Sequence, residues 1–249
     1  MSQEPRRTGF SGPALVRLLA RLTDADVPPP VMSLSGQLSQ WLGWPDAIAL
    51  SAALKAGPPA VPAVAHASGA TAEAQECARV RARLAGAIAE DTAPAARRRA
   101  PPRPSALPDP VDAQVDYAIH RQRYLTLQQA MEGAIGSLRA SLRAALSART
   151  PAMAKLAMVD AVMERALGAR EQSLLGAVPN LLEPHFQRLR QAEAAAQLAD
   201  QAQAAGQAAA ARPGAWLGVF RKDMQSVLLA ELEIRWQPVE GLLAALQDS

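Results

Sequence analysis

The chain of 249 residues contains one cysteine, Cys77, and few aromatic residues: four Trp, three Phe and two Tyr. A single cysteine excludes an intrachain disulfide framework and a cysteine-based metal knuckle. No run of about 18 apolar residues occurs, so we expect no membrane insertion. The first ten residues, MSQEPRRTGF, lack the apolar stretch of a secretory signal, and the expected location is therefore the cytoplasm.

Strand-forming residues are also scarce, and no long stretch alternates apolar with polar positions. Alanine, the best helix former, occurs 56 times. The composition predicts an all-α chain. Arginine far outnumbers lysine, which occurs only at positions 55, 155 and 222, and together with the alanine this suggests a bacterial source with a GC-rich genome.

The usual enzyme motifs are missing: there is no GxSxG elbow, no glycine-rich phosphate loop and no HExxH. The weak metal candidates are Asp116, His120 and His185. Asp116 and His120 share a helix face at a spacing of four, but His185 could join them only if its own helix folds back beside them. We therefore expect no cofactor, no metal and no catalysis, with a metal-dependent enzyme as an alternative.

The basic residues exceed the acidic ones by three, and one cluster stands out, formed by Arg97, Arg98, Arg99 and Arg103. Such a cluster could bind acidic lipid head groups, nucleic acid or an acidic partner. Four charges without a neighbouring amphipathic face give only weak, salt-sensitive binding, so a solvated linker is the simpler interpretation. A nucleic-acid-associated factor that uses these arginines stays as an alternative.

Two proline- and alanine-rich stretches, "KAGPPAVPAVAHASGA" and "APAARRRAPPRPSALPDP", divide the chain and are expected to be disordered. The predicted organisation is a three-helix N-terminal segment at 1–55, a linker at 56–70, an isolated helix at 71–92, a Pro/Arg-rich linker at 93–110 and a long-helix bundle at 111–249.

The stretch "LSQWLGWPDAIALSAAL", residues 38–54, indicates a helix, a tight turn and a second helix. After the turn it offers almost no side chains that read base edges, so a DNA-reading helix-turn-helix is not expected. Two interpretations remain. The hairpin packs on the C-terminal helices, or it forms a docking head for another protein with Trp41 and Trp44 as anchors.

From residue 111 the apolar positions recur at steps of three and four, as in a heptad seam made of Met131, Ile135, Leu138 and Leu142. A helix over 111–148 would be about 57 Å long. We expect an elongated antiparallel helical bundle or hairpin with coiled-coil-like packing. A second copy or another helical protein could cover the seam, with Trp216 and Trp236 as further contact anchors.

Three segments resemble a proteobacterial family catalogued as domain of unknown function 3348: "RTGFSGPALVRLLARLTDADV", the hairpin quoted above, and "FRKDMQSVLLAELEIRWQPVEGLLAAL" near the end. The resemblance covers most of the chain and brings no catalytic residues. It implies a cytoplasmic accessory to a cell-envelope complex. Together with the residues, it favours a non-catalytic interaction or scaffold protein that binds a protein partner or itself.

Overall fold

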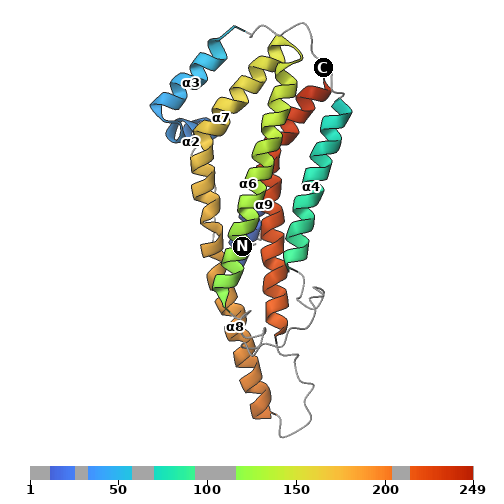
Figure 1. Cartoon of the computed structure of the whole chain (residues 1–249). Helices are drawn as coiled ribbons and strands as arrows, with labels where there is room; N and C mark the ends of the chain where they lie inside the picture. The colour runs from blue at the N-terminus through green and yellow to red at the C-terminus, as the bar shows by residue number, and fades with distance from the viewer. Residues whose placement is uncertain (1–11, 26–32, 58–69, 93–115, 204–213, 249) are drawn as a thin grey trace, which may run out of the picture.

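A computed structural model of the chain describes residues 12–25, 33–57, 70–92, 116–203 and 214–248. Within these ranges all regular structure is α-helical, so the all-α prediction is confirmed. The helices are α1 (Ala14–Thr23), α2 (Leu34–Trp41), α3 (Trp44–Lys55), α4 (Ala70–Thr92), α6 (Tyr117–Ser147), α7 (Pro151–Gly176), α8 (Val178–Gln203) and α9 (Ala215–Gln247). Figure 1 shows an elongated bundle with the long helices side by side.

Some sequence-based predictions fall outside the described ranges. The linker at 93–110 and its arginine cluster do, and so does most of the linker at 56–70. The predicted helix over 111–148 is described only from α6 onward. Among the described residues, no helix combines the length and the apolar character needed to cross a bilayer.

Helices α6 and α9 form the centre of the bundle and run parallel. Near the first turn of each helix, the ring of Tyr117 contacts that of Phe220 at 6.2 Å. Further along both helices, the hydroxyl of Tyr124 on α6 donates a hydrogen bond to Glu231 on α9, so the two helices run in the same direction. Helix α7 runs antiparallel to α6, and α8 continues α7 after a break at Ala177 (Figure 1).

Helix ends are set by local side-chain chemistry. Thr150 caps α7 by accepting a hydrogen bond from the backbone N–H of Met153, and Pro151 occupies the first helical position. Asp116 caps α6 in the same way, through the N–H of Ala118. These caps satisfy N–H groups that have no partner within the helix.

The heptad seam of α6 is buried inside the chain. Met131, Ile135, Leu138 and Leu142 are each at most 6% exposed and belong to one hydrophobic core. Helices α4, α7 and α9 pack around α6 and cover this seam. In the folded chain the seam is therefore core, and it leaves no apolar face for a second copy or another helical protein.

Helix α4, expected to be isolated, packs on α9 and α6. It buries one stripe of side chains: Cys77, Val80, Leu84 and Ile88. Arg81 reinforces the contact by bonding Glu233 and Glu240 of α9, and its guanidinium lies 5.8 Å from the ring centre of Trp236. The surface of α9 on which this stripe packs is distant in the sequence, so no local pattern indicates it.

Candidate functional site

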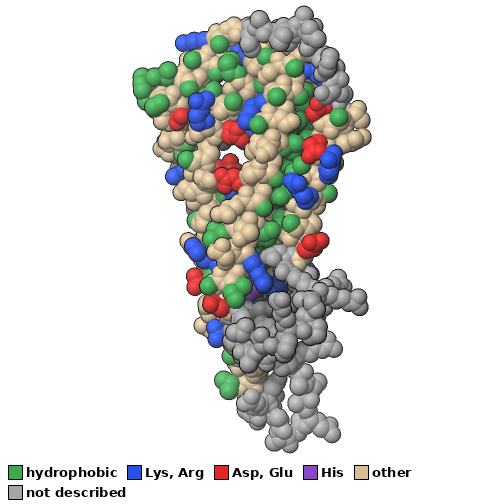
Figure 2. Space-filling model, viewed as in Figure 1, with side chains coloured by type: hydrophobic (Ala, Val, Ile, Leu, Met, Phe, Trp, Pro, Cys, Tyr) green, Lys and Arg blue, Asp and Glu red, His purple; other side chains and the backbone are tan. Residues whose placement is uncertain are grey.

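The α2–α3 hairpin presents apolar side chains to solvent. Helix α3 packs on α7 and buries Ala53. Its opposite face exposes Trp44, Ile48 and Ala52 at steps of four residues, with the Trp44 side chain 80% exposed and Ile48 53% exposed. We call these three residues the hairpin patch. Figure 2 shows hydrophobic side chains gathered at the end of α3 nearest α2.

The other tryptophan of the hairpin, Trp41, lies closer to the bundle. The guanidinium of Arg170, on α7, stands 5.8 Å from the centre of its ring, within the range of a cation–π contact. Trp41 is 37% exposed and also lines the cavity described below. It therefore joins the hairpin to α7 while Trp44 faces solvent.

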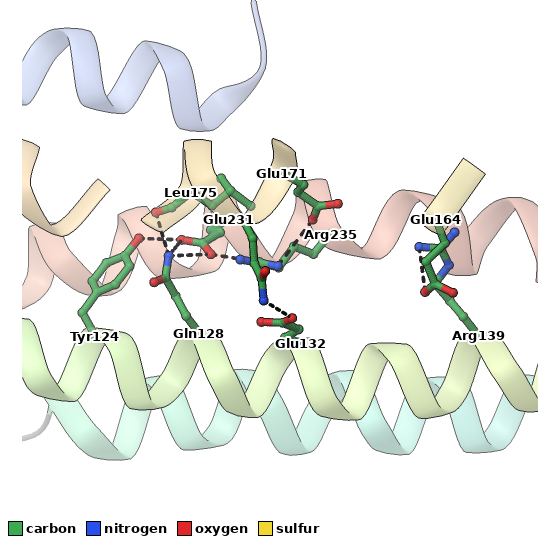
Figure 3. Close-up of polar contacts among 10 residues, drawn as sticks. Tyr124, Gln128, Glu132, Arg139, Glu164, Glu171, Leu175, Glu231 and Arg235 are labelled. Carbon is green, nitrogen blue, oxygen red and sulfur yellow. Dashed lines mark hydrogen bonds and ion pairs between the residues drawn. The ribbon is translucent and has the colours of Figure 1, made fainter. Parts of the chain in front are cut away.

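A polar network crosses the centre of the bundle between α6, α7 and α9 (Figure 3). Glu231 is fully buried and accepts hydrogen bonds from the Tyr124 hydroxyl at 2.8 Å and from Arg235 Nε at 2.9 Å. The Gln128 amide lies 2.9 Å from Glu231 Oε1 and also donates to the backbone carbonyl of Leu175. The carboxylate is thus matched by one guanidinium and two neutral donors, as a buried charge requires.

Both tyrosines of the chain are buried and should titrate abnormally. The pKa of Tyr124 is raised far above its usual value of 10, mainly by burial and then by the neighbouring Glu231 carboxylate. The pKa of Tyr117 is also raised, mainly by burial and then by the charge of Glu183. Because the folded-state pKa lies above the unfolded one, this contribution to stability is complete below pH 10 and is lost as the pH rises above it. We expect the free energy of unfolding to fall by up to about 1.4 kcal/mol per tyrosine and pH unit above that point.

Urea denaturation across this pH range, followed together with tyrosinate absorbance, tests the expectation. The Tyr117→Phe/Tyr124→Phe variant should lose stability less steeply with pH than the parent chain. Tyrosinate absorbance that rises near pH 10 while the helical circular dichroism stays native would contradict the prediction.

A cavity of about 870 Å³ lies beside the polar network, between α6, α7 and α9. Figure 2 shows a hollow between α6 and α7 with acidic side chains in it. Its apolar lining includes Trp41, Ile135, Met163, Leu167, Leu174, Leu175, Ile234 and Pro238. Its charged lining comprises Glu132, Arg139, Asp160, Glu164, Arg170, Glu171 and Arg235.

At one end of the cavity the charges are paired among themselves. Arg139 and Arg143 of α6 bridge to Asp160 and Glu164 of α7, with nitrogen–oxygen distances between 2.6 and 3.2 Å. All four side chains are at most one-third exposed. This cluster fixes the register of the antiparallel α6–α7 pair.

The structure does not bring the three metal candidates together as ligands. Asp116 caps α6, and His120 is buried against the rings of Phe186 and Phe220. Nε2 of His185 lies 2.8 Å from Asp223 Oδ2. Among the described residues, no group of three or more His, Cys, Asp or Glu side chains is arranged to hold a metal ion.

The remaining contact candidates occupy different environments. Trp236 is 3% exposed beneath Arg81, and Trp216 is half-buried with its ring 4.9 Å from that of Phe186. Neither presents a free aromatic surface comparable with that of Trp44. Among the tryptophans, only the hairpin pair fits a contact role at the surface.

Sequence reasoning missed the residues of the polar network and the cavity. Glu231 and Arg235 lie four residues apart on one helix, and ion pairs on the surface of helices have the same spacing. The spacing alone therefore does not indicate a buried pair. Gln128 gave no signal, because its partners lie about 50 and 100 residues away in the chain.

Similarity to known proteins identifies the family of this chain. No curated protein matches the chain, and no solved structure matches it. A family model described as "Protein of unknown function (DUF3348)" matches residues 1–248. The chain therefore belongs to the DUF3348 family.

Proposed function

We propose that this chain is a non-catalytic helical interaction protein whose hairpin patch docks on an apolar surface of a partner protein. The observation that carries the proposal is Trp44, whose side chain is 80% exposed beside Ile48. Large aromatic side chains that stand free in water are typical anchors of protein–protein interfaces. The rigid bundle beneath α3 holds this anchor in place before a partner arrives, which lowers the entropic cost of binding.

The proposed setting is the cytoplasm, in a larger complex to which this chain is an accessory. The resemblance to the family suggests a complex of the cell envelope. A second copy of the chain is the alternative occupant of the hairpin patch, since the same apolar stripe could pair with itself across a twofold axis.

The test compares the parent chain with a Trp44→Ser/Ile48→Ser variant in two measurements. Proteins captured from the lysate of the source organism are quantified by mass spectrometry, and the mass of the purified chain in solution is measured by sedimentation. Leu198→Ser is the matched control, because Leu198 is 67% exposed on α8, far from the hairpin in the sequence.

We expect one captured protein to be lost with the hairpin variant and retained with the control. Loss of a dimer in the hairpin variant alone would assign the patch to self-association instead. If both variants capture the same proteins as the parent chain and sediment alike, the hairpin patch is not a docking surface.

A further inference from the structure

We propose that the cavity between α6, α7 and α9 binds a small organic cation: an amine or quaternary ammonium attached to an apolar ring or chain. This inference does not rest on the docking of the hairpin patch. The cavity has a volume of about 870 Å³, which falls within the range of ligand pockets in proteins, about 300–1,000 Å³.

The apolar part of the lining suits the body of such a ligand. Side chains from three helices contribute carbon surface, including Ile135 from α6, Leu167 from α7 and Ile234 from α9. Trp41 adds an aromatic ring at the side of the hairpin. A ring or short chain placed here would remove apolar surface from water on both partners.

The charges around Arg235 specify the sign of the ligand. Figure 3 shows Glu132 of α6 and Glu171 of α7 on either side of Arg235. The buried Glu231 already pairs with Arg235. The Glu171 carboxylate lies 3.4 Å from Nη1 of the same arginine. Glu132 bonds the neutral amide of Gln172.

At this end two carboxylates, Glu231 and Glu171, share the Arg235 guanidinium, and Glu132 bonds only a neutral amide. The acids at the other end each have arginine partners. A positive group in the cavity beside Glu132 or Glu171 would relieve this excess of negative charge, and an anion would increase it. Arg170, stacked on Trp41, adds a positive charge at the hairpin edge of the cavity, so the favourable place for a cation is the end with Glu132 and Glu171.

Two glycines in helix interiors help keep the cavity open. Gly136 and Gly168 both line it, and a Cβ atom added at either would meet no atom within 4 Å. Glycine in a helix is less stable than alanine by about 1 kcal/mol, so filling these positions would favour the helices while removing the space.

The experiment measures binding of three probes of similar shape to the full chain by calorimetry: naphthylmethylamine, naphthylmethanol and naphthoate. We expect the amine to bind about fivefold more tightly than the alcohol, and the anion to bind least. Glu132→Gln/Glu171→Gln should reduce the affinity for the amine to that for the alcohol. Glu76→Gln, which changes an exposed carboxylate on α4, is the matched control and should leave all three affinities unchanged.

Gly168→Leu tests the place of binding, since it fills the space without touching a charge. We expect it to abolish binding of the amine and the alcohol while the thermal unfolding midpoint stays at or above that of the parent chain. The proposal is overturned if no probe binds, if the three probes bind equally, or if folded Gly168→Leu binds the amine as the parent does.

Discussion

Replacing Glu231 with leucine is expected to lower the free energy of unfolding by about 3–5 kcal/mol. The substitution leaves the Arg235 guanidinium, whose side chain is 8% exposed, without its closest carboxylate. It also removes the acceptor of the Tyr124 hydroxyl and of the Gln128 amide, and each buried donor that loses its partner adds a desolvation cost. Urea denaturation followed by circular dichroism measures the loss.

Two companion variants separate the buried charge from a general effect of the substitution. Glu233 lies on α9, as Glu231 does, and pairs with Arg81 of α4. Because both of these side chains are more than one-third exposed, Glu233→Leu should lower the free energy of unfolding by less than about 1 kcal/mol. Glu231→Leu/Arg235→Leu removes both charges and should recover the part of the stability lost to the unpaired guanidinium, although Tyr124 and Gln128 still lack their Glu231 acceptor. Equal losses for Glu231→Leu and Glu233→Leu would show that Glu231 is not buried as a charged group.

Replacing Phe186 with alanine should cost about 3–5 kcal/mol. Phe186 is fully buried on α8, and its ring contacts those of Tyr117, Trp216 and Phe220 at centroid distances of 4.9–5.4 Å. Most of these ring pairs meet edge to face, which adds attraction beyond the buried area. The smaller side chain leaves a hole where α6, α8 and α9 meet, and the surrounding rings cannot all move into it.

The matched control for Phe186 is Leu181→Ala on the same helix. Leu181 is 44% exposed, so its truncation should cost less than about 1 kcal/mol. Phe186→Leu, which keeps most of the volume, should fall between the two. Thermal and urea unfolding of the three variants give the order. A Phe186→Ala variant as stable as Leu181→Ala would mean that the aromatic cluster is not a packed core.

The parts of the fold that the sequence predicts are those governed by neighbours along the chain. The seam from Met131 to Leu142 is periodic, and periodicity reports burial whatever the partner is. Thr150 and Pro151 set a helix start through contacts within four residues. Which element covers the seam depends on contacts between distant parts of the sequence. The sequence therefore allowed a second chain as the cover, whereas in the structure α4, α7 and α9 cover it.

The candidate site was less predictable, because it depends on where helices distant in sequence meet. Trp236 and Trp44 are the same residue type, each within a helix, yet one is 3% and the other 80% exposed. Glu231 looks like a surface acid in the sequence, and only the approach of Tyr124 and Gln128 from α6 makes its burial tolerable. Pockets of this kind arise from the gap between helices and leave no local pattern.

The docking of α4 on α9 also constrains the order of events during synthesis. Arg81 and its partner Glu233 are separated by 152 residues, which a ribosome adding about 5–20 residues per second needs roughly 8–30 s to make. Until α9 emerges, the Val80, Leu84 and Ile88 stripe of α4 has no α9 surface to bury it. The face of α4 that packs on α9 therefore stays uncovered while the 152 intervening residues are made, so this contact can form only near the end of synthesis.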